Sequence, residues 1–149
     1  YAFRISKVIN DENPILVGLS FGGILSIEIS KIKKLKKLIL ISSAKTQFEI
    51  PIYFRIIGKI GILKYVPSLI FKQKNRLIHF LFGVKSKDEK NLLNAIIEDT
   101  DPHFMKWALQ QIATWDSTEI PINYFHIHGT RDWLLPHVFI QNFTKIKNG

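Results

Sequence analysis

The sequence contains no cysteine. This absence excludes a disulfide framework, a thiolate zinc site and a cysteine nucleophile, and it fits a reducing compartment, so we expect a cytoplasmic protein. Internal repeats and low-complexity tracts are absent as well. The chain has 149 residues, of which 46% are hydrophobic and 22% charged. This size and composition predict one folded domain with a core.

A long apolar run without charges is also missing. The most apolar stretch, residues 50–71, is interrupted by Arg55, Lys59 and Lys64. A membrane-spanning helix needs ~18 or more apolar residues with few or no charges. We therefore expect amphipathic helices in this stretch, and contact with a membrane surface stays open as an alternative.

Acidic residues are scarce. The 12 Asp and Glu residues face 21 Lys and Arg residues, which gives a net charge of +9 and a pI near 9.8. The lysines are scattered, and the one tight cluster, KIKKLKK (31–37), closes a predicted helix, where cations interact favourably with the helix dipole. Scattered charge does not make a specific footprint, so we expect a solvated surface and no nucleic-acid partner.

The order of predicted elements is that of an α/β protein. Residues 1–10 have the apolar spacing of the end of a helix. The apolar run 15–18 predicts a strand buried on both faces, residues 21–34 a packed helix, and residues 38–42 a second strand. This succession implies a right-handed crossover and parallel pairing.

A helical insertion, residues 46–118, is predicted between the second and third strands. Ser86 and Glu89 form a capping-box pattern, and Asp101 with Pro102 predicts a further helix start. The third strand is predicted over residues 122–129, and the pattern after Pro136 is ambiguous.

One motif has the pattern G-x-S-x-G, the nucleophile elbow, with Ser20 at its centre. A turn this sharp strains the serine backbone, and glycines are expected at 18 and 22 because side chains there would collide with the crossing backbone. Gly23 is expected to let the helix pack closely on the strand. The backbone N–H of Phe21 would point at a developing oxyanion.

The alternative is a glycine-rich strand-to-helix turn that binds phosphate and holds an incidental serine. The dinucleotide pattern G-x-G-x-x-G is not matched, because Ser20 stands where its second glycine belongs, and the P-loop lysine is absent. The nucleophile is therefore the preferred interpretation.

These residues resemble the α/β-hydrolase family. The segment PILVGLSFGGILSIEIS (14–30) is similar to its strand–elbow–helix unit, and FHIHGTRDWLLP (125–136) is similar to the segment that carries its catalytic acid. The resemblance covers nearly the whole chain. It implies a partial α/β-hydrolase sheet with three parallel strands present, Asp132 as the acid, and a helical cap over residues 46–118.

The family order is nucleophile, acid, histidine, and the histidine follows the eighth strand. This chain stops about where that strand would begin, so we expect a fragment whose histidine lies outside it and which is inactive alone. His137 is the one histidine after Asp132 and is kept as an alternative base. His126 and His128 share one face of a strand; without a third ligand we interpret them as structural and not as a metal pair.

The resemblance implies a serine hydrolase that acts on a carboxylic ester or a related acyl substrate. Ser20 would attack, the Phe21 N–H would hold the oxyanion, and Asp132 would orient the histidine. Ser42 and Ser43 are expected to line the pocket. No metal or organic cofactor is expected. A non-catalytic ligand-binding module and an acyltransferase remain the alternatives.

Overall fold

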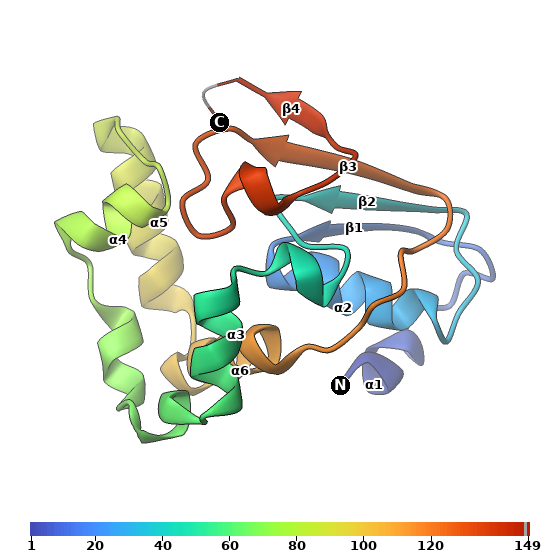
Figure 1. Cartoon of the computed structure of the whole chain (residues 1–149), viewed down its shortest axis with the longest axis horizontal. Helices are drawn as coiled ribbons and strands as arrows, with labels where there is room; N and C mark the ends of the chain where they lie inside the picture. Colours follow the sequence, from blue (N-terminus) through green and yellow to red (C-terminus); the bar gives the residue numbers. More distant parts are fainter. Residues whose placement is uncertain (148) are drawn as a thin grey trace.

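The computed structural model describes residues 1–147 and 149. Four strands form a single parallel sheet in the order β1-β2-β3-β4 (Figure 1). They are β1 (Ile15–Leu19), β2 (Lys37–Ile41), β3 (Tyr124–Gly129) and β4 (Thr144–Ile146). Because all four run in the same direction, the residues that follow them gather at one edge of the sheet, where functional residues lie in open α/β folds.

The crossover helix α2 (Phe21–Ser30) joins β1 to β2 and packs on one face of the sheet, with the short helix α1 (Ala2–Ser6) beside it. The core under α2 is formed by Ile27, Leu38 and Leu40, none of which is more than 1% exposed. These apolar residues come from the helix and from alternate positions of β2, as a half-covered sheet requires. The predicted strand–helix–strand unit is confirmed.

Helices alone connect β2 to β3 across residues 42–123, all of which the structure describes. They are η1 (Gln47–Glu49), α3 (Ile52–Lys59), η2 (Ile62–Tyr65), η3 (Ser68–Lys72), α4 (Arg76–Leu81), α5 (Lys87–Asp99) and α6 (Pro102–Thr114). The helix α6 is the centre of this segment, since α3, η2 and η3 all pack against it.

The predicted helix starts in this segment are confirmed. Ser86 caps α5 by accepting the N–H of Glu89, and the Glu89 carboxylate accepts the N–H of Ser86 in return. The Asp101 side chain caps α6 by accepting the N–H of Phe104. These caps satisfy N–H groups that have no partner inside the helix.

Two features differ from the sequence-based expectation. A fourth strand, β4, pairs with β3 after the short helix η4 (His137–Phe139). The strand β1 is not buried on both faces, because Ile15, Val17 and Leu19 are more than half exposed. It is an edge strand, and within residues 1–147 and 149 only its α2 side is covered.

Among the described residues, no helix reaches the length and apolarity needed to cross a bilayer. The apolar stretch 50–71 forms the three short helices α3, η2 and η3, in agreement with its interrupted pattern.

Candidate active site

Ser20 occupies a strained turn between β1 and α2. Its backbone lies at φ 49° and ψ −120°, in the left-handed range that side chains other than glycine rarely adopt. The Ser20 N–H donates to the carbonyl of Ile41 at 2.9 Å, and the Ser20 carbonyl accepts the N–H of Gly23 at 2.9 Å. The side chain is exposed, and its hydroxyl has no hydrogen-bond partner among the described residues. The strain expected from the motif is confirmed.

The glycines around Ser20 do not all serve the same purpose. A Cβ atom at Gly18 would lie 2.5 Å from the carbonyl oxygen of Gly22, and one at Gly23 would lie 2.3 Å from Oγ of Ser43. Glycine is required at both places by close approach of other atoms. The collision expected at Gly22 is wrong, because a Cβ there meets nothing within 4 Å in the described chain.

The two serines after β2 differ in position. The parallel register pairs Leu19 with Ile41, which brings Ser42 beside Ser20, and Ser42 also has a positive φ of 44°. Ser43 is fully buried, and its hydroxyl donates to the Ser20 carbonyl at 2.8 Å. Of the two, Ser42 lines the cavity that Ser20 and Asp132 border, whereas Ser43 is not among its lining residues in the described chain, so the expectation that both serines line the pocket is half correct. Ser43 instead stabilises the turn at Ser20 through this hydrogen bond.

Two cavities meet at Ser20. The first, of about 280 Å³, has Ser20 beside an otherwise mainly apolar wall formed by α3, α4, α6 and the loop after β3: Tyr53, Phe54, Leu81, Leu109, Ile112 and the run 133–135. The second, of about 440 Å³, is lined by Ser20, Ser42, Arg131 and Asp132 among others. The nucleophile and the acid expected from the sequence therefore border one common cavity.

Asp132 is fixed by its own loop. Its Oδ1 accepts the N–H groups of Leu134 at 3.0 Å and Leu135 at 2.9 Å, and its Oδ2 lies 3.5 Å from Nε2 of His128. His128 is fully buried, and its Nε2 also lies 2.8 Å from the Leu135 carbonyl, which assigns the ring proton to Nε2 because a carbonyl only accepts. The carboxylate is thus pre-oriented at the cavity wall.

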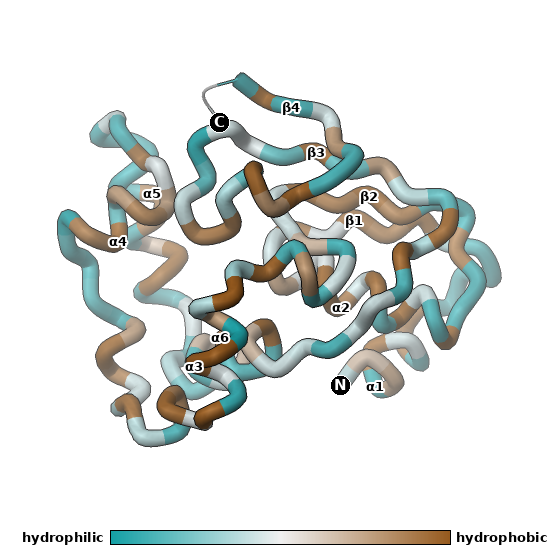
Figure 2. Tube along the Cα trace, viewed as in Figure 1, coloured by the Kyte–Doolittle hydropathy of each residue, from teal (hydrophilic) through white to brown (hydrophobic). Residues whose placement is uncertain are grey.

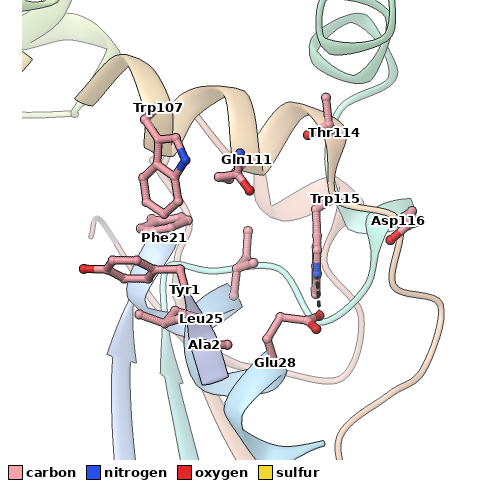
Figure 3. A pocket seen from close by; sticks show the side chains of 11 residues that line it. Tyr1, Ala2, Phe21, Leu25, Glu28, Trp107, Gln111, Thr114, Trp115 and Asp116 are labelled. Carbon is pink, nitrogen blue, oxygen red and sulfur yellow. Dashed lines mark hydrogen bonds between the residues drawn. The ribbon is translucent and has the colours of Figure 1, made fainter. Parts of the chain in front are cut away.

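The side chain of Phe21 lies beside Trp107 of the helical segment (Figure 3). Its ring contacts Trp107 edge-to-face at a centroid distance of 5.5 Å and Phe104 at 6.2 Å. Nearby, Nε1 of Trp115 donates to Oε1 of Glu28 at 2.7 Å. These contacts attach α6 to α2 around a third cavity of about 330 Å³. Because Phe21 is the first residue of α2, its N–H has no acceptor inside the helix.

Solved structures with a similar fold were found across nearly the whole chain. No protein-family model and no curated protein sequence matches. A bromoperoxidase from Bacillus anthracis superposes with a TM-score of 0.55 at 18% identity, over 99% of this chain and 63% of that one. An α/β-hydrolase enzyme from a Medee basin deep-sea metagenome library gives a TM-score of 0.59 at 15% identity, over 98% and 61%.

A homoserine O-acetyltransferase from Bacillus anthracis gives a TM-score of 0.56 at 11% identity, over 99% of this chain and 57% of that one. The chain has an α/β-hydrolase fold. It spans about three fifths of the length of these structures. The likeness at these identities establishes the fold, and the activities for which those proteins are named belong to them.

Among the described residues, no hydrogen bond connects a histidine to Ser20, and no group of three potential metal ligands exists. His126 and His128 lie beside each other on β3 at a ring-centroid distance of 5.6 Å. Nε2 of His126 and Nδ1 of His128 are buried without a partner in the described chain.

A buried polar cluster beneath the site was missed by sequence reasoning. Nζ of Lys45 lies 2.7 Å from Oε1 of Glu49, 3.1 Å from Nδ1 of His126, and 2.5 Å from the carbonyl of Gln141. Burial, followed by the nearby Lys45 ammonium and His128, lowers the pKa of His126 to about 3. The local sequence does not distinguish Lys45 from an exposed loop lysine, because two of its partners lie 81 and 96 residues away along the chain.

Proposed function

We propose that this chain is part of a serine hydrolase that acts on a carboxylic ester or a related acyl substrate. The observation that carries the proposal is Ser20: an exposed hydroxyl on a strained strand-to-helix turn, opening on two cavities, one of them shared with Asp132. Strain in a backbone is retained where function needs it. The helical segment 46–118 is proposed to act as the cap, and the absence of cysteine supports a cytoplasmic location.

In the proposed reaction, Oγ of Ser20 attacks the acyl carbon, and a histidine outside residues 1–149 takes the hydroxyl proton. The N–H of Phe21 donates to the developing oxyanion, and Asp132 orients the histidine and stabilises its positive charge. The alcohol leaves with that proton. Water then attacks the acyl-enzyme, giving the carboxylic acid and the regenerated serine. This chain's residues require no metal or organic cofactor for these steps.

The 280 Å³ cavity supports an apolar acyl group. Its lining beyond Ser20 is aliphatic and aromatic. If one methylene takes about the 30 Å³ that a water molecule occupies in the liquid, the cavity holds a chain of up to about nine carbons. Each buried methylene contributes about 0.8 kcal/mol, so kcat/KM is expected to rise roughly fourfold per added carbon until the cavity is full.

The test measures hydrolysis of p-nitrophenyl esters of increasing acyl length by the protein encoded by the whole reading frame that contains residues 1–149. We expect Ser20→Ala to lower kcat/KM by at least about 10³-fold, since removal of one triad member abolishes nucleophile activation. The matched control Ser42→Ala changes a half-buried serine beside it and should retain activity within about tenfold. Wild-type rates in Ser20→Ala would favour the ligand-binding alternative.

Residues 1–149 assayed alone are expected to be nearly inactive, because the proposed base lies outside them. Acyl transfer is distinguished from hydrolysis by adding a competing alcohol or amine and analysing the products. Dominant formation of the new ester or amide, with little carboxylic acid, would replace the hydrolase proposal by the acyltransferase one.

A further inference from the structure

Seven apolar side chains in the first part of the helical segment are exposed. They lie on α3, η2, η3 and the turn that follows α3, and each is between 48% and 77% exposed: Ile52, Ile56, Ile60, Ile62, Tyr65, Leu69 and Ile70. Figure 2 shows apolar residues along α3 and along the segment that joins it to α4. We refer to these seven residues, together with Lys59 and Lys64, as the cap surface.

The packing of α3 explains why these side chains face outward. Phe54 packs against the core, and a Cβ atom at Gly58 would lie 2.4 Å from the carbonyl oxygen of Ala113, so this side of α3 is pressed onto α6. Ile52 and Ile56 are each two positions from Phe54, which is about 200° around a helix. They therefore point away from the molecule, although their side chains are as apolar as those of the core.

The charged side chains in the part of the sequence that forms the cap surface are all positive. Residues 50–87 contain eight Lys and Arg residues and no Asp or Glu. At the end of α5, Lys74 forms an ion pair with the carboxylate of Glu98 at 2.5 Å, and Lys72 donates to the backbone carbonyl of Glu98. Lys59 has no ion-pair partner within the described residues, and Nζ of Lys64 lies 5.0 Å above the ring of Tyr65 without a carboxylate. Two cations thus stand unneutralised among the exposed isoleucines.

We infer that the cap surface docks on an anionic lipid bilayer, with its isoleucines in the interface and its lysines at the headgroups. Exposed apolar residues interspersed with lysines are the composition of helices that lie in the plane of a membrane. A second copy of the chain fits less well, because a twofold contact through this surface brings like charges together. A nucleic acid would use the lysines and leave seven apolar side chains in water.

The inference does not depend on Ser20, but it is compatible with the proposed acyl substrate. Tyr53 and Phe54 of α3 line the 280 Å³ cavity, while Ile52 and Ile56 of the same helix belong to the cap surface. One helix therefore separates the cavity at Ser20 from the proposed bilayer.

The experiment measures co-sedimentation of the protein with vesicles of phosphatidylcholine mixed with phosphatidylglycerol, and with vesicles of phosphatidylcholine alone. We expect binding to the mixed vesicles that weakens as salt is raised, and much weaker binding to the neutral ones, since each lysine near an anionic surface contributes about 1 kcal/mol. The variant Lys59→Gln/Lys64→Gln should lower the partition coefficient roughly 30-fold. Ile56→Gln/Ile60→Gln should lower it on both kinds of vesicle.

The matched control is Lys37→Gln/Ile122→Gln, which changes an exposed lysine and an isoleucine that is 93% exposed, both away from the cap surface. Control binding should equal that of the wild type, and Ser20→Ala should bind normally whether or not it is active. Equal loss in the control and the cap-surface variants would overturn the inference, as would the absence of binding to mixed vesicles. The inference would also be overturned if the protein bound single-stranded DNA but no vesicles. The same holds if the protein formed a dimer that Ile56→Gln/Ile60→Gln abolishes and bound no vesicles.

Discussion

Ser20 and Lys45 both follow strands at the same edge of the sheet, and their surroundings are opposite. The Ser20 hydroxyl is exposed and has no hydrogen-bond partner in the described chain, and its backbone is strained. The Lys45 ammonium is buried, with an acid, an imidazole nitrogen and a carbonyl around it. The proposed nucleophile has no hydrogen-bond partner on a strained turn, whereas the buried lysine is surrounded by acceptors and a counter-ion. The surroundings of Asp132 are intermediate, because its Oδ1 accepts two N–H groups of its own loop while the side chain stays 17% exposed.

The largest stability effect is expected from breaking the buried pair. Lys45→Met removes the cation and leaves the Glu49 carboxylate buried without its counter-ion, although it still accepts the N–H groups of Lys45 and Gln141. Loss of one partner of a buried pair costs about 3–5 kcal/mol, so we expect the free energy of unfolding to fall by about that amount. Urea denaturation followed by circular dichroism measures it.

The exposed pair of Lys31 and Glu28 is the matched control. Its ion-pair distance is also 2.7 Å, but the two side chains are 35% and 33% exposed. Lys31→Met should therefore change the free energy of unfolding by no more than about 0.5 kcal/mol. A similarly small change in the free energy of unfolding of Lys45→Met would show that the buried ion pair contributes little to stability.

The second prediction concerns the pH dependence of stability. His126, with its pKa lowered to about 3 from 6.5, stays neutral in the folded protein while the unfolded chain takes up a proton. Stability contributed by the neutral ring is complete above pH 6.5 and is lost as the pH falls toward 3. Between pH 7 and pH 5 this one group should lower the free energy of unfolding by roughly 2 kcal/mol.

The variant His126→Gln isolates this effect, because an amide oxygen can still accept from Lys45 and does not titrate. Its unfolding free energy should change less between pH 7 and pH 5 than that of the wild type, by the same roughly 2 kcal/mol. Parallel pH profiles for the two proteins would assign the acid sensitivity to other groups.

The sequence predicted the features that neighbouring residues determine. Apolar strand runs, the glycines at 18 and 23, and the caps at Ser86 and Asp101 depend on positions only a few residues apart. The open face of β1 could not be predicted, because what covers a strand is decided by distant segments. The strand β4 was missed because its three residues are exposed and carry no apolar run.

The candidate site divides in the same way. Ser20 and Asp132 were predicted from local motifs, and the structure brings them to one cavity. Lys45 was not predicted, because its partners at His126 and Gln141 lie far along the chain. Ser43 was predicted as a pocket residue. Its hydrogen bond to the Ser20 carbonyl depends on the register between β1 and β2, which places the ends of the two strands side by side.

A smaller stability effect than those at Lys45 and His126 is expected at Ser43, a buried residue that donates a hydrogen bond to the exposed Ser20. Ser43→Ala removes the hydroxyl that donates to the Ser20 carbonyl, and this carbonyl keeps the N–H of Gly23. The free energy of unfolding should fall by only about 1 kcal/mol. Ser26→Ala is the matched control, because it removes a hydroxyl that donates to the Gly22 carbonyl one helical turn away, at 2.7 Å, and should cost about 0.5 kcal/mol or less.

The kcat of the proposed enzyme should differ more between Ser43→Ala and Ser26→Ala than the free energy of unfolding does. If Ser43 positions the nucleophile, its loss misplaces Ser20 and lowers kcat by roughly tenfold or more at little change in KM. Ser26→Ala, which removes no hydrogen bond to Ser20 itself, should keep the wild-type kcat. An equal and small change in kcat in both variants would mean that the hydrogen bonds of Ser20 to Ile41 and Gly23 suffice to hold the strained turn. The buried Ser43 would then make no contribution to the position of Ser20.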